Sequence, residues 1–184
     1  MARKQPLNRW KGLVVGVVGG VAGVLALKFY WRRIEPELLP PDFNPPLPDE
    51  VKNLPDIEPA FGRLYRDGES PTAAAGRALY TQLVGAEPDE RTSRWLDDAA
   101  LLAWGIAAGA TYGATRNTTR WRDVAGGVFY GLRLWAGDTV STALLGLRAD
   151  PKAVSAREHL SWLIGHWVYS FVMTNLARVL YRLL

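Results

Sequence analysis

The sequence predicts an all-α membrane protein, a four-transmembrane-helix bundle with a proline-rich periplasmic loop and a short extramembrane helix. Two observations support this. Charged residues are absent from 12–27, 99–115 and 160–177, and 124–147 carries only Arg133 and Asp138. By contrast, 34–98 holds most of the acids and most of the prolines. A composition of 48% hydrophobic and 22% charged residues therefore averages very apolar segments with one polar insert.

The first predicted span covers residues 12–31, which is long enough to cross a hydrocarbon core of about 30 Å. Basic residues precede this run, so a cleavable signal peptide is the alternative. The apolar run is too long for one, no small-x-small cleavage site follows it, and Lys28, Arg32 and Arg33 come next. We therefore expect a retained membrane anchor.

Three further spans are predicted over 96–115, 123–147 and 159–180. Aromatic residues lie near their ends, where headgroups would be: Trp95, Trp121, Trp162 and Tyr181. The alternative is a soluble helical domain on a single anchor. Four spans divide the chain into a cytoplasmic N-terminus with the first helix (1–33), a periplasmic loop (34–94) and a three-helix bundle (95–184).

The charge distribution predicts the orientation. Four spans place both termini and the 116–122 turn on one side, with nine basic residues against the single acid Asp123. The other side receives sixteen of the eighteen acids. Short cytoplasmic loops are enriched in Lys and Arg, so we expect both termini to be cytoplasmic.

The predicted outer loop has two parts. Residues 34–59 are dense in proline, and we expect them to run extended because proline interrupts regular helix. Residues 72–86 predict a short helix that lies either on the membrane surface or on a partner. Asp97 and Asp98 precede an apolar run and predict a helix start there, since carboxylates favour exposed helix-start amides.

Glycines recur at every fourth position in the predicted spans. Such spacing lets two helix backbones approach closely in a membrane. It predicts either packing within this bundle or assembly with partner helices. The helix-packing candidates are Gly12, Gly16, Gly20, Gly105, Gly109, Gly113, Gly127 and Gly131.

Ionisable residues inside a span are candidates for function because burying an unpaired charge is costly. Asp138 and His166 lie about 13 Å below the predicted outer surface, so they are expected at a similar depth. Paired, they would relay a proton or hold two helices together. Arg133 lies about 15 Å in from Asp123. We expect it to meet a hydroxyl of Thr111 or Tyr112, or a lipid or cofactor anion.

Several chemistries are excluded or disfavoured. Without cysteine there is no disulfide and no thiolate site, and two histidines leave little room for zinc. No phosphate-binding glycine loop, G-x-S-x-G or H-E-x-x-H motif is present. The basic residues lie at span ends, which indicates anionic lipid rather than nucleic acid. We therefore expect no catalytic residues, no metal and no cofactor, with lipid or pigment contact the open possibility.

A set of glycine and aromatic motifs resembles a known group. The motifs are G-x-x-x-G-x-x-G-G-x-x-G from Gly12, G-x-x-x-G-x-x-Y-G from Gly105, R-x-x-x-G-G-x-x-Y-G from Arg122, W-x-G-D from Trp135, L-L-G-L from Leu144 and G-H-x-V-Y from Gly165. Together they resemble the YagU-like family of small bacterial inner-membrane proteins of unknown function. The resemblance implies a four-span inner-membrane protein, sometimes linked to acid tolerance, without established catalytic residues.

The sequence thus predicts a non-enzymatic membrane accessory or assembly subunit of the bacterial inner membrane. Its expected partners are membrane lipids and other transmembrane proteins of a larger complex. Two alternatives remain open. One is a small transport or proton-handling protein that uses Asp138, His166 and Arg133; the other is a lipid- or pigment-binding membrane protein.

Overall fold

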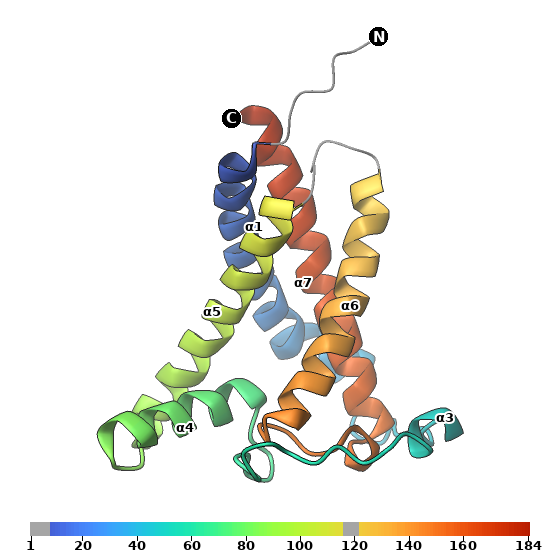
Figure 1. Ribbon diagram of the computed structural model, residues 1–184. Coiled ribbons are helices and arrows are strands. Elements are labelled where there is room, and N and C mark those ends of the chain that lie inside the picture. The colour runs from blue at the N-terminus through green and yellow to red at the C-terminus, as the bar shows by residue number, and fades with distance from the viewer. Residues whose placement is uncertain (1–7, 116–121) are drawn as a thin grey trace. The chain divides into compact units, whose positions relative to one another are not determined.

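The computed structural model describes residues 8–115 and 122–184, and this part of the chain is all-helical, without strands (Figure 1). The long helices are α1 (Arg9–Phe29), α5 (Glu90–Thr115), α6 (Arg122–Leu144) and α7 (Ala156–Leu183), with α4 (Pro71–Val84) between α1 and α5 in the sequence. A π-helical turn (Tyr30–Ile34) and α2 (Glu35–Leu38) continue α1. The remaining elements are α3 (Asp49–Lys52) and a 3-10 turn (Pro151–Ala153).

One helical stretch of the described residues, Arg9–Leu38, is long and apolar enough to cross a membrane. A signal sequence or the buried core helix of a soluble protein can have the same length and composition. Elsewhere in the described residues no helix meets the criterion, so the four-span prediction is not confirmed. The physical reason lies in the composition of the other helices, where polar and small residues reduce the mean hydropathy.

The chain divides into two compact units. The first, here called the glycine unit, comprises Met1–Ile34, Leu102–Leu132 and Ile164–Leu184. The second, the proline unit, comprises Glu35–Leu101 and Arg133–Leu163. Each is built around its own set of contacts.

In the glycine unit, α7 buries one face whose side chains recur at helical spacing. Tyr169, Met173 and Ala177 are completely buried and lie four residues apart. Ser170 and Thr174 widen this face and are also buried. The Tyr169 hydroxyl donates a hydrogen bond of 2.5 Å to the Gly105 carbonyl of α5. A polar group that would be costly to bury alone therefore joins two helices.

In the proline unit, α4 is defined by strong local signals. Ser70 caps its N-terminus by accepting a hydrogen bond of 3.1 Å from the Ala73 amide, and Pro71 occupies the first turn. Gly85 ends it in the left-handed conformation, with φ of 77°. The helix predicted over 72–86 is therefore present as α4. Gly76 faces Leu96 of α5, so α4 packs closely on the start of that helix.

The start of α5 differs from the prediction. The helix begins at Glu90, two turns before Asp97. Asp97 instead accepts hydrogen bonds from the hydroxyls of Ser70 (2.9 Å) and Thr72 (2.5 Å). Its carboxylate therefore fastens α4 to α5 instead of capping α5, a tertiary role that local sequence does not reveal.

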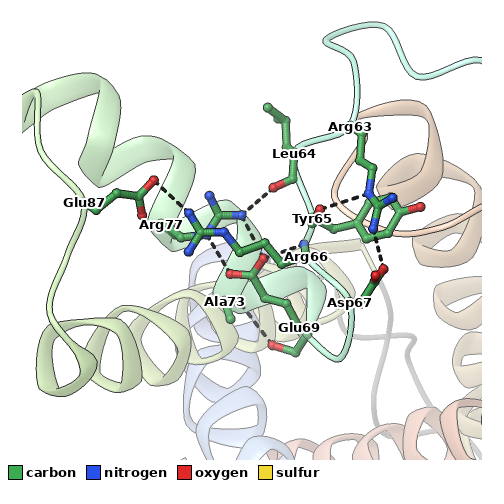
Figure 2. A network of polar contacts seen from close by, with 10 residues as sticks. Arg63, Leu64, Tyr65, Arg66, Asp67, Glu69, Ala73, Arg77 and Glu87 are labelled. Carbon is green, nitrogen blue, oxygen red and sulfur yellow. Dashed lines mark hydrogen bonds and ion pairs between the residues drawn. The ribbon is translucent and has the colours of Figure 1, made fainter.

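The loop before α4 is held by a polar network (Figure 2). Arg77 of α4 donates two hydrogen bonds of 2.8 Å to Glu69 and one of 2.5 Å to the Leu64 carbonyl. The two charged side chains are only 13% and 14% exposed. Outside this pair, Arg66 bonds Glu87 at 2.9 Å, so the network also reaches the turn after α4.

We expect acid to weaken this network. The Arg77 hydrogen bonds lower the pKa of Glu69 below its ordinary value of 4.5. A carboxyl with a lowered folded-state pKa stabilises the protein above its unfolded pKa, and this stability is lost as pH falls through the folded pKa. The midpoint of urea unfolding should therefore fall on acidification below about pH 4.5. Glu69→Gln should be less stable at neutral pH and show a smaller acid dependence. An acid dependence as large as that of wild type in this variant would contradict the prediction.

The proline-rich stretch is not wholly extended. Two one-turn helices, α2 and α3, interrupt it, which corrects the expectation of a continuous extended run. It continues into a segment that bonds the end of α6, because the Ala60 amide donates to the Leu144 carbonyl (2.7 Å). The amides of Leu64 and Tyr65 donate to the Gly146 carbonyl at 2.7 and 3.0 Å.

Candidate functional site

The glycines of α1 and α5 face each other in the glycine unit. Gly12 lies against Gly113, Gly16 against Gly109 and Gly20 against Gly105, so the two helices run antiparallel with matching four-residue steps. A Cβ atom at any of these positions would overlap the opposing helix. At Gly109, for example, it would lie 2.8 Å from the Gly20 Cα. The structure thus uses these six glycines for contact within the chain.

The remaining predicted packing glycines face α7. A Cβ at Gly127 would lie 2.7 Å from the Thr174 hydroxyl, and one at Gly131 would lie 2.8 Å from the Trp167 ring. The Tyr130 hydroxyl between them donates a hydrogen bond of 2.7 Å to the Ala108 carbonyl of α5. Close approach to α7 and a bond to α5 therefore hold this part of α6 in the glycine unit.

His166 lies in an aromatic cluster of the glycine unit. It is buried, and its ring meets the edge of Trp104 with centroids 5.5 Å apart. Trp104 also packs at 5.0 Å against Tyr169. Asp138 belongs to the proline unit, and its predicted pairing with His166 stays a prediction.

Arg133 is an exposed residue of α6. Its guanidinium makes no hydrogen bond or ion pair with any residue the structure describes. Asp138 follows five residues later and is half-buried, so the two side chains leave α6 in different directions. The structure therefore does not join Arg133 and Asp138 into one site.

Arg133 is the first of four exposed residues on one side of α6. This surface, here called the Arg133 face, consists of Arg133, Gly137, Ser141 and Leu144. These positions lie three or four residues apart and share one side of the helix. A Cβ at Gly137 would meet no atom within 4 Å. Among the helical glycines whose surroundings the structure describes, only Gly137 leaves such open space.

Asp138 shares an electrostatic environment with two residues of the proline unit. The negative charge of Asp138 interacts electrostatically with Arg148, and so does that of Glu158 at the start of α7. Burial lowers the pKa of Arg148 to about 10, and the two carboxylates oppose this shift. Arg148 therefore stays a cation at neutral pH, and the charges of both carboxylates favour this form.

Arg148 is the residue that the sequence interpretation missed. It is 7% exposed, and its guanidinium carbon lies 3.3 Å from the centroid of the Trp162 ring. Its two terminal nitrogens are buried and bond no described residue. An arginine directly after an apolar helix end resembles a loop residue in sequence. Trp162 was predicted as an interfacial residue, and its spacing from Arg148 gives no sign of the stacking.

No group of three or more histidine and acidic side chains in the described residues is arranged to hold a metal ion. The chain matches no family model, no curated protein and no solved structure.

Proposed function

We propose that this chain is a non-enzymatic accessory or assembly subunit of a membrane protein complex. A helix of a larger partner docks on the Arg133 face of α6. The proposal includes the four-span topology, a bacterial inner-membrane location with both termini cytoplasmic, and kinship with the YagU-like family. The glycine spacing, the charge asymmetry and the motifs described above support these parts.

The observation that carries the proposal is Arg133. In the four-span arrangement its guanidinium lies about 15 Å from the cytoplasmic end of α6, at the depth of the hydrocarbon core. A cation at this depth is costly unless it meets an acid, a carbonyl group or water. Because Arg133 is exposed and unpaired among the described residues, a partner that supplies a carboxylate would remove this cost.

Gly137 provides the second feature of a docking surface. It lies one turn beyond Arg133 and presents bare backbone to its surroundings. Small residues at this spacing allow close approach of a second helix in a membrane. Every other helical glycine whose surroundings the structure describes meets a neighbour within the chain, whereas Gly137 is open to an external helix.

We expect Arg133→Gln and Gly137→Leu each to reduce co-purification of the partner at least tenfold, about 1.4 kcal/mol or more. The measurement is native mass spectrometry of the complex isolated from its host membrane in mild detergent. Arg94→Gln is the matched control, because Arg94 is also exposed but lies at the extramembrane start of α5. A stable wild-type monomer without a co-purifying protein would overturn the proposal. So would equal losses in all three variants.

A further inference from the structure

The proline unit contains a cavity of about 680 Å³. Its walls come from residues 45–57 of the proline-rich stretch, from 135–140 of α6, and from 151–163 around the start of α7. This volume is within the range of small-molecule sites in proteins. Leu54 and Val140 line it and remain 49% and 47% exposed, so the cavity opens to the surface between the stretch and α6.

Polar bonds hold the proline-rich stretch on both sides of the cavity. Before it, Arg157 donates a hydrogen bond of 2.9 Å to the Leu39 carbonyl and pairs with Glu35 at 3.4 Å. After it, the Ile57 amide donates to Asp150 at 2.8 Å, and Lys152 pairs with Asp56. In the described structure no hydrogen bond joins residues 45–55 to α6 or α7. The stretch thus spans the cavity between fixed ends, with mostly apolar and no charged side chains beneath it.

The surface of the cavity wall is almost entirely apolar. None of its residues is charged, and five are prolines, which lack an amide hydrogen. Three polar side chains contribute, Trp135, Thr139 and His159. Their indole nitrogen, hydroxyl and imidazole Nδ1 bond no described residue, but all three atoms are buried and therefore closed to a ligand in the cavity. The His159 Nε2 lies 2.8 Å from the Pro151 carbonyl oxygen, so it is already engaged. A polar ligand would lose its hydration here without gaining partners, whereas a hydrocarbon chain would lose nothing.

We infer that this cavity binds an acyl chain of a membrane phospholipid. The inference rests on the membrane placement in the proposed function. Val140 and Trp135 lie four and nine residues before the end of α6, or about 6 and 13 Å along the helix. One leaflet contributes about 15 Å of hydrocarbon, so in this placement the cavity lies at the depth of outer-leaflet acyl chains. Val140 lines the cavity and is exposed, so in this placement an acyl chain would enter beside it.

The experiment follows lipid retention by the purified full chain. The protein is extracted from liposomes of one defined phosphatidylcholine into mild detergent and measured by native mass spectrometry. We expect one retained phospholipid in wild type. Ala136→Phe, which adds bulk at the cavity wall, should reduce retention at least fivefold. Ala99→Phe is the matched control, since Ala99 is an exposed alanine of α5 outside the cavity, and it should retain lipid as wild type does.

A second measurement locates the chain within the protein. Phosphatidylcholine brominated in its acyl chains quenches nearby tryptophan fluorescence, and Trp135 lines the cavity. The brominated lipid should quench the tryptophan fluorescence of reconstituted wild type more than that of Trp135→Phe. When both proteins also carry Ala136→Phe, this difference should disappear. This readout keeps the test valid if Ala136→Phe affects folding, because Trp135→Phe is compared with wild type directly.

Four results would overturn the inference. These are no retained lipid in wild type, equal retention in Ala136→Phe, a free long-chain acid or alcohol in place of the phospholipid, or displacement of the lipid by a bound partner protein.

Arg133→Gln separates this inference from the proposed function, because it should lose the partner and keep the lipid. Lipid retention without any partner would reject the accessory role alone, and a partner without retained lipid would reject the lipid site alone.

Discussion

Replacing Gly109 by valine is expected to lower the free energy of unfolding by about 3 kcal/mol or more. A Cβ at this position would overlap the Gly16 carbonyl oxygen and would lie within 3 Å of the Gly20 Cα and N atoms. The obstacle is helix backbone, which cannot rotate away as a side chain does. Helices α1 and α5 would have to separate, and the neighbouring Gly12–Gly113 and Gly20–Gly105 contacts would loosen together.

The measurement is the unfolding midpoint of the purified protein in mild detergent, followed by tryptophan fluorescence. Gly137→Val is the matched control, because it makes the same chemical change in a helix at an exposed position where an added Cβ meets no atom within 4 Å. It should alter the free energy of unfolding by no more than about 0.5 kcal/mol. A Gly109→Val protein as stable as Gly137→Val would show that the α1–α5 contact is not close.

Replacing Arg77 by methionine is expected to cost about 2 kcal/mol. Methionine preserves much of the length of the side chain but removes both hydrogen bonds to Glu69 and the bond to the Leu64 carbonyl. Glu69 is then left as a largely buried carboxylate without its counter-ion, a state more costly than the loss of one exposed pair. We expect α4 and the preceding loop to open first.

Amide hydrogen exchange over α4, together with urea unfolding, tests this prediction. Arg63→Met is the control, since the Arg63–Asp67 pair is 55% and 92% exposed, and exposed pairs contribute little. The acid dependence attributed to Glu69 should also shrink in Arg77→Met, because the shift in its pKa depends on Arg77. Unchanged exchange over α4, or an equal effect of Arg63→Met, would contradict this assignment.

Local signals in the sequence predicted the elements well where each signal acts within one helix. Ser70, Pro71 and Gly85 mark the ends of α4 without reference to any other segment. The four-residue glycine steps in α1 and α5 predicted close helix packing, although spacing alone left both internal and external partners open. The structure shows the internal contact for Gly12, Gly16 and Gly20, and it leaves Gly137 open.

Contacts between distant segments were not predictable in the same way. Asp97 resembles a helix start but binds the cap of α4, which precedes it by more than twenty residues. Arg148 resembles an exposed loop residue but is buried against Trp162. The cavity joins a proline-rich stretch to helix ends that lie roughly a hundred residues further along the chain.

The sequence by itself determined that the chain is helical, where glycines permit close packing and where charge is excluded, because these properties follow from residue type and spacing along one helix. Only the tertiary structure decided which glycine faces which backbone, that Arg133 is exposed while Arg148 is buried, and that the prolines cover an apolar cavity. Burial and pairing depend on segments that folding brings together. The local sequence around a residue does not show which distant segment will lie against it.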